Sequence, residues 1–163
     1  MRTTDKFVFF WGNNDIYSNF LYSPFKHNGI VFKWSEQAIM YRKAMLFGAK
    51  DVAQSIVKAQ TPKACKDLGR SRKIPFDNLV WDNKKMNIFK EVLLDKFSNP
   101  KLKQQLLATG DRILVEASPF DKIWGIGLDE NHPDVENPSK WKGENLLGKV
   151  LMEVRDELKQ KGE

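Results

Sequence analysis

The stretch VFKWSEQAIMYRKAMLF, residues 31–47, constrains the fold of this chain more than any other. It is predicted to form the end of a strand and then a helix capped by Ser35, because a serine oxygen accepts a hydrogen bond from a first-turn amide. One face of that helix carries residues at the spacing of a 3.6-residue period, namely Glu36, Ile39, Met40, Lys43 and Phe47. Its apolar members require a core, so the helix is expected to pack inside the fold.

Two charged residues lie on the same face and mark a candidate site. Glu36 and Lys43 are two helical turns apart, and burying a charge costs free energy unless the charge is paired or solvated in a cleft. An acid and an amine directed toward the core are therefore candidates for chemistry. A wider polar face, with both side chains extended to its edge, explains the pattern equally well.

Length and charge indicate the class of protein. The 163 residues suit one compact domain that spans residues 1–163. The net charge of +6 favours anionic partners such as phosphates or nucleic acid. The basic residues are spread along the chain, so the charge alone does not establish nucleic-acid binding.

Cysteine usage and hydropathy indicate the compartment. Cys65 is the only cysteine, so no internal disulfide can form, and a reducing, cytoplasmic setting is expected. With no obvious base beside it, Cys65 is interpreted as a small packing residue. No apolar run is long enough to cross a membrane, and the N-terminal one is too short for a signal peptide, so no membrane partner is expected.

The sequence lacks the motifs of common cofactor and metal sites. It contains no Walker loop and no GxGxxG after a predicted strand. His27 and His132 lack the spacing of metal ligands, and the acidic residues around His132 are interpreted as a solvated loop. We therefore expect neither a cofactor nor a metal.

Sequence patterns predict several helices and short strands. Strands are expected at residues 6–11, 30–32 and 112–117, with a hairpin turn at His27-Asn28-Gly29. Helices are expected at residues 51–59, 81–98, 99–110 and 146–159, and another begins with Thr61 as its cap and Pro62 in its first turn. Residues 128–142 form a long polar stretch, and loops of that length in a small domain are usually functional or mobile.

Three segments supply candidate ligand contacts. Asn19, between the aromatic residues of YSNF, either reads a base or ribose edge or forms an Asx turn. Arg70 and Arg72, with Lys63 and Lys66 upstream, lie in the densest basic patch, which either binds a phosphate or is a solvated face. Trp124 lies between Asp121 and two glycines, where its indole either stacks on a ligand ring or is pinned under a turn.

The order of these motifs resembles that of the YbiA-like N-glycosidases, also called NADAR proteins. The first half of the family pattern is met by Ser18-Asn19-Phe20, Pro24, Gly29, Trp34, Glu36 and Lys43. The second half is met by Gly69-Arg70, Trp81, Lys96-Phe97, Leu114-Val115-Glu116, Asp121, Trp124-Gly125-Ile126-Gly127, Gly143-Glu144-Asn145-Leu146-Leu147-Gly148 and Leu151-Met152-Glu153-Val154-Arg155. No single piece is specific, but the ordered set covers nearly the whole chain.

This chain departs from the family pattern at two places. Relatives often carry an aromatic residue and a glutamine where Ile39 and Arg42 stand here, and they differ in the loop of residues 129–141. Both departures bear on the exact ligand.

The resemblance implies a compact single α+β domain, mostly helical with a small sheet, that hydrolyses an N-glycosidic bond. Similar members act on phosphoribosylamino-pyrimidine intermediates of riboflavin synthesis, which we take as the first expectation. Others remove ADP-ribose from guanine bases, including those in DNA. The expected partner is therefore a phosphorylated ribosyl or ADP-ribosyl substrate, and the second alternative includes ADP-ribosylated nucleic acid.

The implied reaction assigns roles to the matched residues. It needs a proton for the leaving amine, stabilisation of a ribose cation and an attacking nucleophile. Glu36 or Asp121 is expected to supply the acid–base step, while Lys43 either forms a Schiff base with the opened sugar or holds Glu36 ionised. Trp34, Trp81 and Trp124 are the predicted stacking surfaces, and Asn19 and Asn145 are the predicted polar readers. Arg70 and Arg72 are expected to contact phosphate. Gly125 is expected to let the backbone approach the ligand closely.

Two interpretations from other classes stay open on the sequence alone. A non-catalytic module for ADP-ribose or a related nucleotide would keep the aromatic residues and the basic patch, but it would not need both Glu36 and Lys43. A nucleic-acid-binding protein is the other, and its binding would weaken steeply with salt.

Overall fold

Strand β2 (Phe7–Phe10) is central to one part of the computed structural model, which describes residues 1–162. The chain forms two units: residues 1–18 group with the chain from residue 100 onward, and residues 19–99 group together. We call them the sheet unit and the helical unit. Residue 163 lies outside the described residues, and the single domain expected over residues 1–163 stays a prediction.

The sheet of the sheet unit has the order β1 (Arg2–Thr3), β2, β5 (Ile113–Glu116). β1 is antiparallel to β2, whereas β5 is parallel to it, with Phe7 opposite Ile113 and Phe10 opposite Glu116. All four residues of β2 are buried, as is usual for a parallel strand with both faces covered. The strands expected at residues 6–11 and 112–117 are confirmed, and β1 was not expected.

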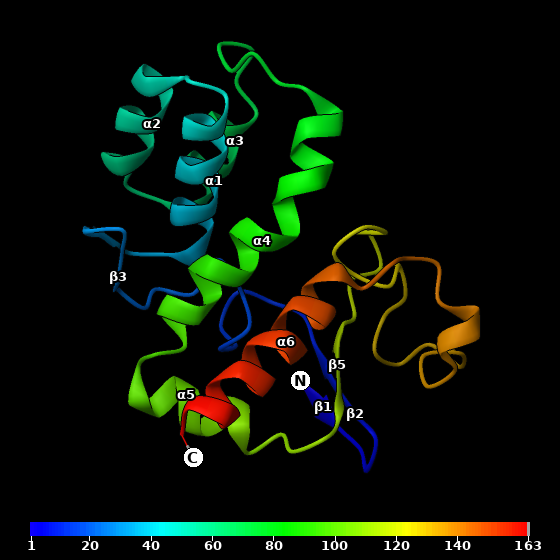
Figure 1. The fold of residues 1–163 in the computed structure, drawn as a ribbon. Coiled ribbons are helices and arrows are strands. Elements are labelled where there is room, and N and C mark those ends of the chain that lie inside the picture. Colours follow the sequence, from blue (N-terminus) through cyan, green and yellow to red (C-terminus); the bar gives the residue numbers. More distant parts are fainter. Residues whose placement is uncertain (163) are drawn as a thin grey trace. The chain divides into compact units, whose positions relative to one another are not determined.

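Helix α6 (Leu146–Lys161) packs on β5, and α5 (Pro100–Leu107) packs on α6 (Figure 1). At Gly148 an added Cβ would lie 2.1 Å from the carbonyl oxygen of Leu114, so a glycine is required where the helix meets the strand. The helix expected to end at Gly110 ends at Leu107, while the expected start of α6 is confirmed.

The long polar stretch contributes to the core of this unit. It contains a short 3-10 helix, η1 (Pro138–Lys140), and the indole of Trp141 donates a hydrogen bond of 2.7 Å to the carbonyl of Val135. Trp141 also packs against a buried cluster made of Phe7, Phe9, Val115, Ala117, Ile126, Leu128 and Val135. Part of the segment expected to be functional or mobile is therefore structural.

The helical unit begins with the hairpin of β3 (Phe25–His27) and β4 (Ile30–Phe32), which pair antiparallel. Its turn residues, Asn28 and Gly29, have φ angles of 50° and 82°. Two-residue hairpin turns require this left-handed region, so the turn expected from Asn-Gly is confirmed.

Helix α1 (Ser35–Leu46) packs against the other helices of this unit, which are α2 (Lys50–Val57), α3 (Pro62–Gly69) and α4 (Asn78–Lys96). Ala38, Ile39 and Ala44 on α1 are completely buried, so the expected core-facing helix is confirmed. In residues 1–162 no helix combines the length and the apolar composition needed to span a membrane.

Three helix starts test the expected caps. The Thr61 hydroxyl accepts a hydrogen bond of 3.1 Å from the amide of Ala64, as expected. Helix α4 begins earlier than expected because Asp77 accepts bonds from two first-turn amides. The expected Ser35 cap is wrong: Trp34 occupies the cap position, and Ser35 is already the first residue of α1.

Candidate active site

The first turn of α1 places Glu36 beside a loop that Asn19 fastens to the helix. The amide of Glu36 donates to the carbonyl of Asn19 at 3.0 Å, and the Ser35 hydroxyl donates to Asn19 Oδ1 at 2.8 Å. The Nζ of Lys96, a residue only 1% exposed, donates to the same hydroxyl at 3.4 Å. Asn19 therefore positions Glu36, and its expected role as a base reader stays a prediction.

The surroundings of Glu36 suit proton transfer near neutral pH. Burial raises the pKa of the Glu36 carboxyl from 4.5 to about 7, although the charges of Lys66, Arg70 and Lys43 each act to lower it. Desolvation disfavours the charged form of a carboxyl, and nearby cations favour it. At this pKa both forms are populated at neutral pH, so Glu36 can donate a proton and take one back.

Lys43 lies two turns further along α1 between two aromatic rings. Its Nζ is 4.7 Å from the ring centre of Phe76 and 5.5 Å from that of Trp81. Burial lowers the pKa of Lys43, the charge of Arg70 lowers it further, and Glu36 acts in the opposite direction. A lowered pKa increases the share of neutral amine, which is the nucleophilic form.

Helix α3 brings further cations to Glu36. Gly69, at its end, packs so closely on α1 that an added Cβ would lie 2.1 Å from the sulfur of Met40. The charges of Lys66 and Arg70 consequently act on the Glu36 carboxyl. Arg70 and Arg72 are both exposed, but Arg72 is not among those charges, and the expected phosphate contacts of both stay predictions.

The two tryptophans expected in this unit differ in exposure. Trp34 is only 7% exposed, and its ring meets that of Tyr22 edge-on, with centroids 6.4 Å apart. This low exposure gives Trp34 a packing role, and its expected role as a stacking surface stays a prediction. Trp81 is partly exposed and its ring lies 5.5 Å from the Nζ of Lys43, as suits a site residue.

In the sheet unit, Asp121 shapes the loop that carries Trp124. Its Oδ1 accepts hydrogen bonds from the amides of Ile123 at 2.9 Å and Trp124 at 2.8 Å, and its own amide donates to Ser118 Oγ at 3.1 Å. These bonds give Asp121 a structural role. Its catalytic role and the stacking role of Trp124 stay predictions.

Asn145 and Gly125 both contribute to the packing of the sheet unit. Asn145 is 2% exposed; its Nδ2 donates to the carbonyl of Leu114 at 3.0 Å and its Oδ1 accepts from the amide of Glu116 at 3.0 Å. These bonds to β5 give Asn145 a structural role, and its expected role as a polar reader stays a prediction. Gly125 is buried, and an added Cβ would lie 2.9 Å from the carbonyl of Asp121, so tight packing accounts for the glycine.

Two residues with notable surroundings were not among the expected site residues, and a third was expected only as a member of the basic patch. Lys66 was expected in the basic patch, upstream of Arg70, and its spacing of four residues from Arg70 is that of one helical face. Phe76 lies in a loop, where no periodic signal exists. Glu116 ends β5, and burial, followed by the charges of Asp15 and Asp121, raises the pKa of its carboxyl to about 8.

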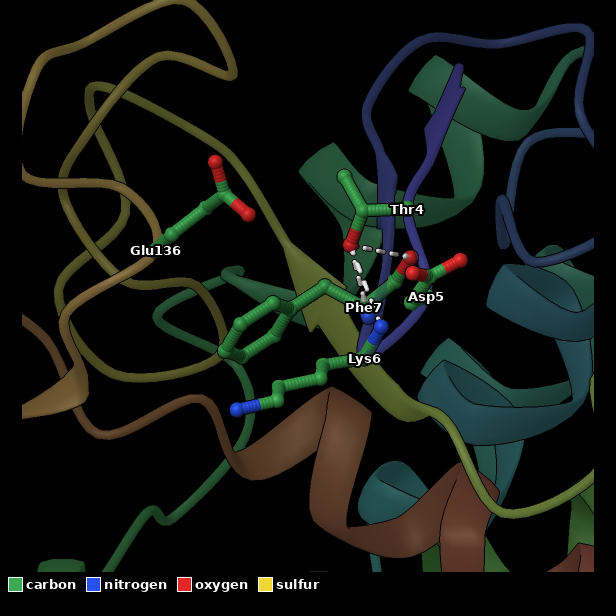
Figure 2. A pocket seen from close by; sticks show the side chains of 5 residues that line it. All are labelled: Thr4, Asp5, Lys6, Phe7 and Glu136. Atoms are coloured by element: carbon green, nitrogen blue, oxygen red, sulfur yellow. Dashed lines mark hydrogen bonds between the residues drawn. The ribbon is translucent and has the colours of Figure 1, made fainter.

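A pocket at the start of β2 contains none of the expected site residues. Figure 2 shows its lining, which consists of Thr4, Asp5, Lys6, Phe7 and Glu136. The Thr4 hydroxyl accepts hydrogen bonds from the amides of Lys6 and Phe7, so this side chain serves the entry into the strand. Within residues 1–162 no three histidine, cysteine or carboxylate side chains gather as metal ligands would.

Comparison with known proteins identifies the family. The model of the NADAR domain matches residues 9–159. The chain belongs to the NADAR family. The α+β fold is also confirmed, because the solved structure of the E. coli protein YbiA superposes with a TM-score of 0.79 at 28% identity, over 99% of this chain and 89% of that one.

Two relatives of this NADAR chain bear on its activity. An N-glycosidase of Acanthamoeba polyphaga mimivirus is 43% identical over 96% of this chain and 99% of its own length. A chloroplastic riboflavin biosynthesis protein PYRR of Zea mays is 33% identical over 80% of this chain, which corresponds to 21% of that protein. The expected enzyme class, a hydrolase of N-glycosyl bonds, agrees with the name of the first relative.

Proposed function

We propose that this chain is an N-glycosidase that cleaves the bond between a phosphorylated ribose carbon and an exocyclic amine. One observation carries the proposal: Glu36, with a pKa of about 7, and Lys43, with a lowered pKa, lie on one face of α1 among aromatic and cationic side chains. A module that only bound nucleotides would not need this acid and this amine together.

In the proposed reaction, Glu36 begins protonated and Lys43 begins as a neutral amine. Opening of the sugar leaves an imine between C1 and the exocyclic nitrogen, and the Lys43 nitrogen adds to C1. Glu36 and Lys43 each give one proton to the exocyclic nitrogen, so the C1–N bond to the base breaks and a protonated imine on Lys43 and an ionised Glu36 remain. Water then adds to the resulting imine with Glu36 as the base, which releases the sugar aldehyde and restores the Lys43 amine.

The contacts of Lys43 favour this role over simple pairing with Glu36. Within residues 1–162 no ion pair joins the two side chains at 4.0 Å or less. Lys43 is also the last of the three cations that lower the Glu36 pKa, behind Lys66 and Arg70. Its principal neighbours are the rings of Phe76 and Trp81, which carry no net charge and therefore form no ion pair with it.

For the substrate, we propose the phosphoribosylamino-pyrimidine intermediates of riboflavin synthesis, supported by the name of the maize relative. ADP-ribosylated guanine is the second candidate, because it also joins a ribose carbon to an exocyclic amine. The test incubates the protein separately with each substrate and follows released ribose phosphate or ADP-ribose.

Borohydride reduction tests the covalent step. During turnover it should fix one sugar per protein on the peptide that carries Lys43, as measured by mass spectrometry. The Lys43→Arg variant keeps the charge but should neither turn over nor acquire the adduct. Turnover by Lys43→Arg at the wild-type rate would leave direct attack by water as the mechanism.

A further inference from the structure

Lys66 on α3 and Arg70, which follows the last residue of that helix, act on Glu36 and, among residues 1–162, have no carboxylate of their own. Lys66 and Arg70 are four residues apart and share a helical face. In the described part of the chain neither has a carboxylate oxygen within 4.0 Å. Lys63 on the same helix differs, because its Nζ pairs with Asp67 at 3.1 Å and its side chain is 79% exposed.

The position of Lys66 is defined by its neighbours. It is partly buried, and its Nζ lies 5.9 Å from the ring centre of Phe20, in the loop next to Asn19. Because Lys66 and Arg70 both act on one carboxyl group that is only partly ionised at neutral pH, this region has an excess of positive charge. Such an excess attracts an anion.

We propose that Lys66 and Arg70 form one subsite that binds the phosphate group of the ribosyl substrate. The inference rests on the proposed function only for the identity of the ligand. Arg70 offers a planar fork of donors and Lys66 a point charge, a combination that suits phosphate oxygens. Arg72, which was expected to take this role, is outside the subsite.

The ligand chemistry is a terminal phosphate on ribose. A phosphate monoester carries about −1.5 to −2 charges at neutral pH, which two adjacent cations can balance. The diphosphate of ADP-ribose spreads its charge over two linked phosphates. Ribose 5-phosphate and ADP-ribose are therefore the two probes that distinguish a terminal phosphate monoester from a diphosphate.

Calorimetric titration of the Glu36→Gln protein measures binding without turnover. In this background Lys66→Gln should weaken ribose 5-phosphate binding by about 10- to 100-fold, the usual effect of one charge-assisted hydrogen bond. Lys66→Arg should restore most of the affinity. Lys63→Gln is the matched control, because it removes a lysine from the same helix, and Arg72→Gln tests the alternative cation; both should change affinity less than threefold. Thermal unfolding of each variant verifies the fold.

The experiment distinguishes failure of the subsite from failure of the proposed function. Equal losses from Lys63→Gln and Lys66→Gln, or no binding of ribose 5-phosphate, would overturn the subsite. A loss confined to ADP-ribose would overturn the monoester assignment. If wild-type protein cleaved neither substrate while Lys66→Gln still weakened binding selectively, the proposed function would fail and the subsite would stand.

Discussion

Replacing Glu36 by glutamine should raise the stability of the protein at alkaline pH while removing its activity. The pKa of Glu36 is raised from 4.5 to about 7, chiefly by burial. Between these two values the unfolded chain has lost the proton and the folded protein keeps it. The free energy of unfolding therefore falls as pH rises through this window and levels off above pH ~7.

The size of the effect follows from the pKa difference. About 2.5 pKa units at ~1.4 kcal/mol each give a loss of about 3 kcal/mol in the wild-type protein above neutral pH. Glutamine stays neutral at every pH and incurs no such loss. Glu36→Gln should therefore match the wild type near pH ~4 and exceed it by up to about 3 kcal/mol near pH ~8.5.

Urea unfolding followed by tryptophan fluorescence at both pH values measures this, with turnover assayed on the same preparations. Activity should fall by ~10²–10⁴-fold, the usual contribution of a positioned acid or base. Glu153→Gln, at an exposed position of α6, is the control and should change neither quantity. A Glu36→Gln protein less stable than wild type near pH ~8.5 would refute the raised pKa, and undiminished turnover would refute the acid–base assignment.

Three other predictions concern fold, binding and metals. Asn145→Ala should lower the free energy of unfolding by about 2–4 kcal/mol in urea titrations, because it removes two hydrogen bonds to β5 and places alanine at a φ of 53°; an unchanged midpoint would contradict this. Arg70→Ala should raise KM more than it lowers kcat, since a phosphate contact stabilises ground and transition states alike; a selective fall in kcat would place Arg70 in the chemistry. Turnover should survive EDTA, because residues 1–162 hold no cluster of metal ligands; restoration of EDTA-inhibited activity by a divalent ion would show otherwise.

Local rules account for what the sequence predicted well. The face of α1 follows from the spacing of its apolar residues, and the Asn28-Gly29 turn follows from the φ angles that hairpins demand. Thr61 caps α3 through a bond to an amide three residues away. Each of these features depends on residues close together in the chain, so a single sequence is enough to predict it.

Distant partners account for the contacts that the sequence did not predict. Asn145 resembles a ligand reader in the sequence, but its bonds go to Leu114 and Glu116 on a strand some thirty residues earlier. The sequence pattern suggests that Trp34 is an exposed stacking surface, but tertiary packing buries its side chain. The aromatic contact of Phe76 with Lys43 joins a loop to a helix with no regular spacing between them. Such placements depend on tertiary packing, which periodicity does not encode.

The parallel pairing of β2 with β5 has a consequence for biosynthesis. A ribosome that adds roughly 5–20 residues per second completes β2 several seconds before β5 exists. During that interval the Phe-rich strand has no parallel partner, whereas the helical unit, residues 19–99, already has its whole sequence. The nascent chain therefore exposes an unpaired hydrophobic edge early in synthesis, and FVFF is the segment that a ribosome-associated chaperone would be expected to hold.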